Sequence, residues 1–304
     1  MRERLFHPVT LLAFVLALAA SVPAVAAAQS IVGKWIVVNQ PARLVNGTPV
    51  LFRVITPKPV RTLSANWLGH EIAFSFDASH KSWFALAGVS LETKPGAYPI
   101  EFHAETSSGP SAGQAISFEK QIRVQHQSYP RHVVLSVPGR YTAPNPEDLH
   151  QIEQDKETKA EAFKTLSPER EWKGSFAAPV TAEISDVFGA ERVFNGSVQS
   201  THFGLDFRVP GGTSVAAVNS GRVILAQPMF YEGNFVVIDH GQGLLTLYLH
   251  LSSFLVKEGD DVSKGQPIGL SGGTGRATGP HLHLAVRWQG VYLDPQVLLK
   301  LNLP

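Results

Sequence analysis

The stretch Gly279-Pro280-His281-Leu282-His283-Leu284 decides how the C-terminal part of this chain is expected to fold. The apolar residues in and after this stretch predict a strand, and Pro280 is tolerated at the start of one. Alternate residues of a strand point to the same face, so His281 and His283 are expected to lie side by side.

A second pair of polar residues lies upstream, in the stretch Thr201-His202-Phe203-Gly204-Leu205-Asp206-Phe207. If this segment is extended, His202 and Asp206 share a face as well. Two imidazoles and a carboxylate suit a zinc site whose fourth position stays open for water. A closed structural site more often recruits a fourth protein ligand such as cysteine, and this chain has no Cys.

Taken together, these residues resemble the M23 family of zinc metallopeptidases, the LytM or lysostaphin type. That family carries H-x-x-x-D, then a histidine in a Y-x-H-L context, then G-x-P-H-x-H. All three blocks stand here in that order, with Tyr248-Leu249-His250-Leu251 as the middle one. The resemblance covers residues 175–295 and implies an antiparallel sheet with an open groove and a metal on its floor.

By that resemblance, His202, Asp206 and His283 bind one zinc ion per chain, and His250 and His281 are the catalytic residues. The chain has no H-E-x-x-H motif, so another proton acceptor is needed, and histidine titrates in the right range. We assign His281 to orienting and deprotonating the zinc-bound water. We assign His250 to transition-state stabilisation and proton transfer to the leaving amine. The reverse division of roles stays open.

Three further residues lie near the groove by the same analogy and are candidates for substrate binding: Asn195, Tyr248 and Arg276. A core position is the alternative for Tyr248, because it lies on a strand among apolar residues. His240, in a hairpin turn, is interpreted as structural.

Composition allows one large domain or, as we expect, two domains with real cores, since 304 residues include 44% hydrophobic residues, 26 Gly and 21 Pro. A formal net charge of +1 gives no electrostatic case for nucleic acid. The absence of cysteine excludes a disulfide framework and a Cys-ligated zinc.

The N-terminus reads as a secretory signal, with Arg2 and Arg4 before an apolar run too short for a comfortable membrane span. Ala26-Ala27-Ala28 is the expected cleavage site, and an uncleaved anchor is the alternative. We therefore expect no stable membrane span after signal cleavage.

The fold class is expected to be mainly β. Short β-prone runs with turns between them, such as Val50 to Ile55 and Tyr98 to Phe102, predict an immunoglobulin-like sandwich. A charged stretch from Asn145 predicts a helix over a domain boundary, interpreted mainly as a solvated face. The expected organisation is a signal peptide at 1–28, a β-domain at 29–140, a charged helical linker at 141–174 and a metallopeptidase domain at 175–304.

The resemblance implies an exported zinc endopeptidase that hydrolyses peptide cross-links or stems of bacterial peptidoglycan through a zinc-bound water. The Ala-rich signal, the absence of cysteine and the absence of a visible sorting signal favour a Gram-negative periplasm and D,D-endopeptidase activity. A secreted or signal-anchored location stays open.

The alternative function is a non-catalytic wall-binding regulator that activates a separate amidase. The presence of all five active-site positions favours catalysis over this reading. The expected partners are peptidoglycan peptides, and the N-terminal β-domain is expected to bind the wall, to contact and cover the groove, or to act as a spacer.

Overall fold

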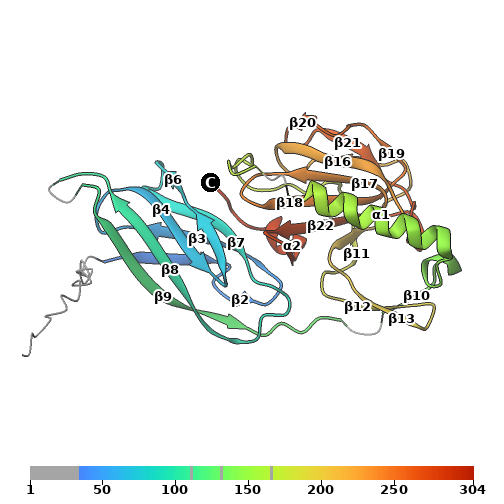
Figure 1. Ribbon diagram of the computed structural model, residues 1–304, viewed down its shortest axis with the longest axis horizontal. Coiled ribbons are helices and arrows are strands. Elements are labelled where there is room, and N and C mark those ends of the chain that lie inside the picture. Colours follow the sequence, from blue (N-terminus) through green and yellow to red (C-terminus); the bar gives the residue numbers. More distant parts are fainter. Residues whose placement is uncertain (1–33, 110–111, 131–132, 165–166) are drawn as a thin grey trace, which may run out of the picture. The chain divides into compact units, whose positions relative to one another are not determined.

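The computed structural model describes residues 34–304 except 110–111, 131–132 and 165–166 (Figure 1). The predicted signal peptide, residues 1–28, lies outside the described residues. Strands dominate the described residues, which confirms the expectation of a mainly β chain. No helix among the described residues is long and apolar enough to cross a membrane.

Two sheets form the N-terminal part of the described chain, and nearly all neighbouring strands in them are antiparallel. The sheets share one core, in which the rings of Phe52 and Trp67 meet edge to face with centroids 5.4 Å apart. The four-stranded sheet has the order β1 (Ile36–Gln40), β3 (Pro49–Ile55), β7 (Ser82–Gly88) and β6 (Ser75–Asp77). The five-stranded sheet has the order β2 (Leu44–Val45), β9 (Ala115–Gln125), β8 (Gly96–Thr106), β4 (Val60–Trp67) and β5 (His70–Ala73), with β2 parallel to β9.

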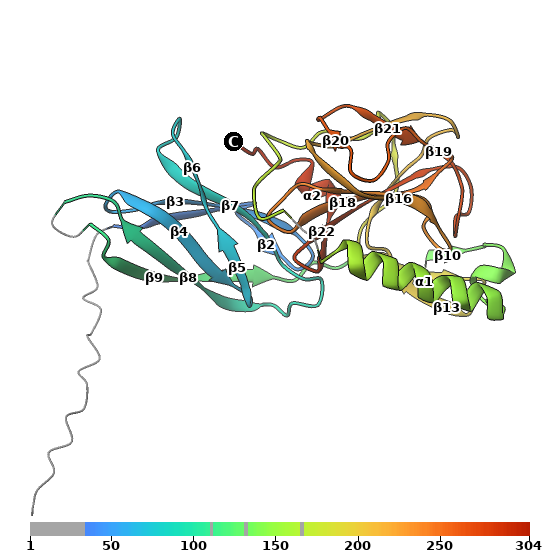
Figure 2. The same cartoon turned by 45° about the horizontal axis from the view of Figure 1, so that its top comes forward.

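Helix α1 spans Pro146–Ala162, within the predicted linker. Asn145 and Asp148 close a capping box at its first turn, where proline is also favoured. The charged sequence is not only a solvated face, because Asp155 is buried and its Oδ2 accepts from the Phe230 N–H at 2.6 Å. The helix packs against strand β16 (Gly221–Met229) (Figure 2), and Ala162 at its end lies against the apolar cluster that contains Leu225.

The principal sheet of the C-terminal part is antiparallel and positions the candidate site (Figure 1). Its strands, in order, are β11 (Ile184–Asp186), β14 (Leu205–Phe207), β22 (Leu282–Trp288), β18 (Leu244–Leu251), β17 (Gly233–Asp239), β16 and β20 (Asp261–Val262), with β23 (Val291–Leu293) paired to β22. In this register Asp206 lies opposite His283, and His283 lies opposite Leu249 on the other side. The strand pairing thus brings together residues 77 and 34 positions apart in sequence.

Two smaller sheets complete the C-terminal part. They consist of β15 (Ser214–Ala216), β21 (Pro267–Leu270) and β19 (Ser253–Phe254), and of β10 (Val133–Leu135), β12 (Glu191–Phe194) and β13 (Val198–Thr201). The short helices are η1 (Gly139–Tyr141) and α2 (Pro295–Leu298). Because β10 pairs in parallel with β12, the chain joins the C-terminal sheets before the predicted boundary at 175.

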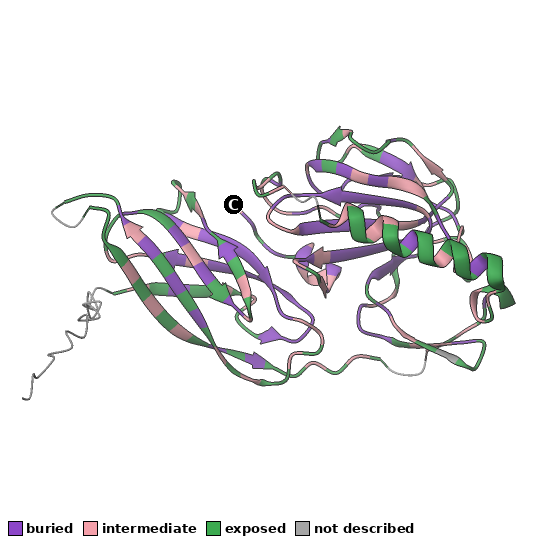
Figure 3. Cartoon of the chain, viewed as in Figure 1, coloured by how far each residue is buried: buried purple, intermediate pink, exposed green. Residues whose placement is uncertain are grey.

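Burial follows the sheets, with the inner strands of the principal sheet almost wholly covered (Figure 3). His240 belongs to this interior: it is fully buried, its Nδ1 lies 2.6 Å from the Ser220 carbonyl, and its Nε2 lies 2.7 Å from the Thr246 hydroxyl. Burial lowers the pKa of His240 to about 4. The structural interpretation of this histidine is therefore supported.

Candidate active site

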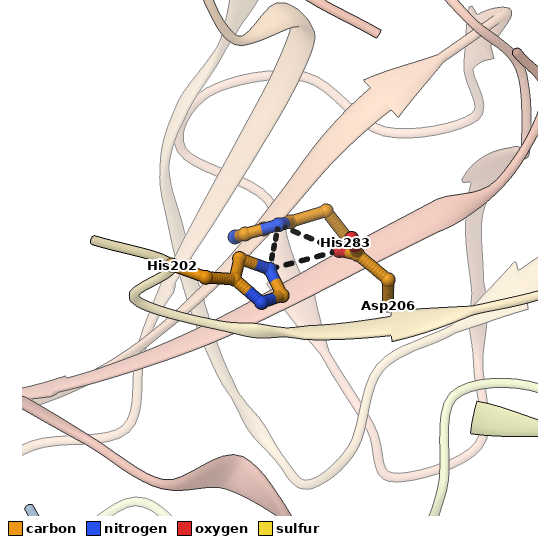
Figure 4. Close-up of side chains that lie close together, drawn as sticks. All are labelled: His202, Asp206 and His283. Carbon is orange, nitrogen blue, oxygen red and sulfur yellow. Dashed lines mark hydrogen bonds and ion pairs between the residues drawn. The ribbon is translucent and has the colours of Figure 1, made fainter. Parts of the chain in front are cut away.

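Three donor atoms converge at the centre of the site: His202 Nε2, Asp206 Oδ1 and His283 Nδ1 (Figure 4). Asp206 Oδ1 lies 3.1 Å from His202 Nε2 and 2.8 Å from His283 Nδ1, and the two nitrogens are 3.0 Å apart. The segment that carries His202 and Asp206 is not one extended strand, because β13 ends at Thr201 and β14 begins at Leu205. A Cβ on Gly204 between them would lie 2.3 Å from His283 Nε2, so the glycine leaves room for that ring.

The donor set fits a divalent metal such as zinc. His202 Nδ1 lies 2.8 Å from the Val187 carbonyl, which can only accept, so Nδ1 carries the ring proton and Nε2 presents its lone pair. Burial lowers the pKa of His283 to about 4, which favours the uncharged form of this ring near neutral pH. Three buried donor atoms this close together could hold a metal ion, and N/N/O sets of this kind hold zinc.

Arg192 holds the carboxylate of Asp206 from the side away from the histidines. Its Nη2 donates to Asp206 Oδ2 and, at 2.6 Å, to Asp186 Oδ2, and its Nε reaches the same Asp186 oxygen at 2.9 Å. With Oδ2 engaged by the guanidinium, Oδ1 is left facing the two imidazoles. Such outer contacts orient metal ligands and affect metal affinity.

We expect Arg192→Gln to weaken zinc binding by about 10- to 100-fold, because Asp206 loses the donor that fixes its orientation. Competition with a chromogenic chelator measures the affinity. Arg208→Gln is the matched control, since Arg208 is an exposed arginine beside the site and the guanidinium bound to Asp206 is that of Arg192. Equal affinities of the two variants would contradict the positioning role.

His250 and His281 lie beside the three donors. Their rings are 4.8 Å apart between centroids, and the His250 ring is 6.0 Å from that of His283. His250 Nδ1 lies 2.8 Å from the Thr274 carbonyl and His281 Nδ1 lies 2.8 Å from the Gly279 carbonyl, so both rings turn Nε2 toward the site. Burial lowers the pKa of His250 to about 3, and the neighbouring His281 and His283 act in the same sense.

The backbone of His250 is left-handed, with φ of 64°, a conformation that costs energy for residues other than glycine. The His250 N–H donates to the Glu232 carbonyl at 2.8 Å, which holds this conformation in place. Strain of this kind at a residue of the candidate site is consistent with a functional constraint on its orientation.

Two hollows open beside these residues, and both are lined by Arg192, Phe194, His250 and Arg276. The Tyr231 hollow, of about 230 Å³, is further lined by His202, His283, Tyr231, Glu232 and Lys159. The Pro280 hollow, of about 410 Å³, is further lined by Asp206, His281 and Pro280. The donor residues therefore line two hollows that share these four residues, and we call the two hollows together the groove.

Comparison with known proteins matches residues 200–295 to peptidase family M23. The chain contains an M23 peptidase domain. It is 50% identical to the peptidoglycan DD-endopeptidase ShyA of Vibrio cholerae over 103 residues, which are 34% of this chain and 23% of that protein. It is 44% identical to the DD-carboxypeptidase/endopeptidase Mpg of Neisseria meningitidis over 94 residues, which are 31% of this chain and 22% of that protein.

A solved structure, a putative M23 peptidase from Pseudomonas aeruginosa, is similar over 84% of this chain and 95% of its own, with a TM-score of 0.62 and 29% identity. The matches to the curated relatives thus span less than a quarter of their length, whereas the match to this solved chain spans nearly all of it. The M23 domain contains the five residues that sequence reasoning placed in the site, His202, Asp206, His250, His281 and His283.

The three candidate substrate-binding residues lie in three different environments. Tyr248 is fully buried, and its hydroxyl accepts from the Val218 N–H at 2.9 Å, which is the core position left open as an alternative. Asn195 binds the backbone of Val137 with both ends of its amide and lines neither hollow. Arg276 lines both hollows.

Sequence reasoning did not identify some of the residues that line the groove. Lys159 of helix α1 lines the Tyr231 hollow and forms an ion pair with Glu232 in the turn between β16 and β17. Residues 73 positions apart carry no local signal of such a pair. The described residues that line the two hollows lie between positions 133 and 292, and a contact of the N-terminal β-domain with the groove stays a prediction.

Proposed function

We propose that this protein is an exported, zinc-dependent endopeptidase that cleaves peptide cross-links of bacterial peptidoglycan. The observation that carries the proposal is the convergence of His202, Asp206 and His283 in a groove, with two further histidines turned toward them. The relatives named as DD-endopeptidases support D,D specificity, and an action on the wall supports a location outside the cytoplasm.

His202, Asp206 and His283 would hold the zinc ion through the atoms that already face one another. When bound, zinc supplies a Lewis acid that makes water nucleophilic near neutral pH. Arg192 keeps Asp206 in the orientation that this site needs. The hollow beside the donors leaves one side of the site open to a substrate.

His281 and His250 would carry the proton transfers at their Nε2 atoms, since Nδ1 of each points to a backbone carbonyl. An uncharged imidazole first accepts a proton and then donates it, which suits a reaction that takes a proton from water and returns one to an amine. We assign removal of the water proton to His281, whose Nε2 lies 3.9 Å from Asp206 Oδ1. That proton would then pass to His250, whose ring centroid is 4.8 Å from that of His281, and His250 would deliver it to the leaving amine. This division is part of the proposal.

The experiment is a digest of purified peptidoglycan sacculi with the mature protein, analysed by mass spectrometry of the released fragments. We expect conversion of cross-linked dimers to monomers, loss of that conversion with a chelator, and its recovery when zinc is restored. Conversion that resists complete metal removal would overturn the zinc mechanism. A zinc-loaded protein that releases nothing would instead favour the non-catalytic regulator.

A further inference from the structure

Arg276 lines the groove, and its guanidinium group lies against two aromatic rings. Its guanidinium carbon lies 4.5 Å from the ring centroid of Phe194 and 4.7 Å from that of Tyr231, so two aromatic side chains hold it. Its main-chain N–H donates to the Tyr231 carbonyl at 2.9 Å. A Cβ on the preceding Gly275 would lie 2.3 Å from the backbone of Gly233, so the loop is seated closely against the β16–β17 turn. The side chain is therefore presented from a fixed backbone.

The N–H donors of this guanidinium have no carboxylate partner among the described residues. Arg192, the other arginine of both hollows, is occupied by Asp186 and Asp206. Glu232 lies near enough to act on Arg276 electrostatically, but it forms its ion pair with Lys159. Among the described residues, Arg276 thus packs against aromatic rings and forms no hydrogen bond or ion pair with a carboxylate.

We propose that Arg276 binds a free carboxylate of the substrate, on the residue that supplies the nitrogen of the scissile amide. A planar guanidinium held between rings matches a carboxylate with two parallel hydrogen bonds and is only weakly hydrated. This inference rests on the proposed function and deepens it by naming a feature of the substrate.

We place the carboxylate on the amine side of the scissile amide because Arg276 and His250 depend on the same loop, the one that contains Thr274. His250 Nδ1 contacts the carbonyl of Thr274, two residues before Arg276, and both side chains line the same two hollows. The proposed role of His250 places the leaving nitrogen at its Nε2. A carboxylate on the carbon next to that nitrogen then lies toward Arg276.

The consequence is a preference for a class of bond. Arg276 favours amides whose amine-side residue has a free α-carboxylate, as in a carboxypeptidase substrate or a cross-link made to the amino group of a D-amino acid. It gives no advantage to bonds inside a glycine chain, where that carboxylate is already part of the next amide. A relative named for both DD-carboxypeptidase and endopeptidase action is consistent with this class.

The test uses two synthetic branched peptides that differ in one group. In both, D-alanine acylates the amino group of a D-amino acid, which bears a free carboxylate in one peptide and a primary amide in the other. We expect zinc-loaded wild-type protein to prefer the acid by about 10- to 100-fold in kcat/KM, as charge-assisted hydrogen bonds allow. Arg276→Gln is expected to lose that preference by slowing only the acid, and Arg276→Lys to keep part of it.

Arg287→Gln is the matched control, because Arg287 also lies over an aromatic ring, Phe163 at 4.5 Å, but lines neither hollow. Zinc content and melting temperature verify folding of each variant. Equal rates on acid and amide by the wild type, or an equal loss on both in Arg276→Gln, would overturn the inference.

If the wild type cleaves neither peptide nor sacculi, the proposed function fails. Calorimetric affinities for the two peptides then decide: an acid preference that Arg276→Gln removes supports the carboxylate role, and equal affinities refute it.

Discussion

The His283→Ala protein is expected to bind no stoichiometric zinc and to release no fragments from sacculi. His283 Nδ1 lies within 3.0 Å of both other donor atoms, so its removal leaves two ligands, and the three protein ligands of a catalytic zinc site are no longer available. The metal supplies several kcal/mol of transition-state stabilisation, so we expect the rate to fall by roughly 1,000-fold or more. Metal analysis of the purified protein and the sacculus digest measure the two effects.

His126→Ala is the control for this experiment, because His126 is an exposed histidine of the N-terminal β-domain. His202→Ala is expected to behave like His283→Ala, since its Nε2 is another of the three donors. A His283→Ala protein that keeps its zinc and its turnover would show that the metal lies elsewhere. A folded variant that loses zinc but digests sacculi at the wild-type rate would refute the metal's role in the reaction.

Short-range rules explain part of the predicted geometry at the candidate site. His281 and His283 were expected on one face of a strand, and both contribute atoms to the site. The segment from His202 to Asp206 was expected to be extended, and the chain instead leaves one strand and enters another at Gly204. The pair meets nevertheless, since β14 aligns Asp206 with His283 and the His202 ring is fixed by the Val187 carbonyl.

Other features depend on contacts that no local pattern encodes. In strand β4, a register shift between Val60 and Thr62 interrupts the alternation of buried and exposed residues, so a period-two pattern describes this strand poorly. Helix α1 was expected as a charged helix, yet its Asp155 and Lys159 reach backbone and side chains of the β16–β17 turn. Tyr248 lies in the middle of a strand whose residues are nearly all buried, so its position near His250 in sequence gave no access to the groove.

The second large effect is expected at His250, and it separates turnover from metal binding. We expect His250→Asn to keep zinc but to reduce kcat by about 100- to 10,000-fold, the range of general acid–base catalysis. Asparagine is the better replacement, because it tolerates the left-handed backbone of this residue, φ 64°, more readily than alanine. Its side chain is short and does not titrate, so it cannot relay a proton. Metal analysis and steady-state kinetics measure the two quantities.

A change of leaving group then identifies the step that His250 serves. A substrate with an activated leaving group, such as a nitroanilide, departs with little help from a proton donor. If His250 protonates the leaving amine, His250→Asn loses much less activity on this substrate than on a peptide, whereas His281→Ala loses as much on both. The opposite pattern would reverse the two roles, since Nε2 of each ring faces the site and the geometry alone accommodates either order. Wild-type turnover by His250→Asn on the peptide itself would remove His250 from the mechanism.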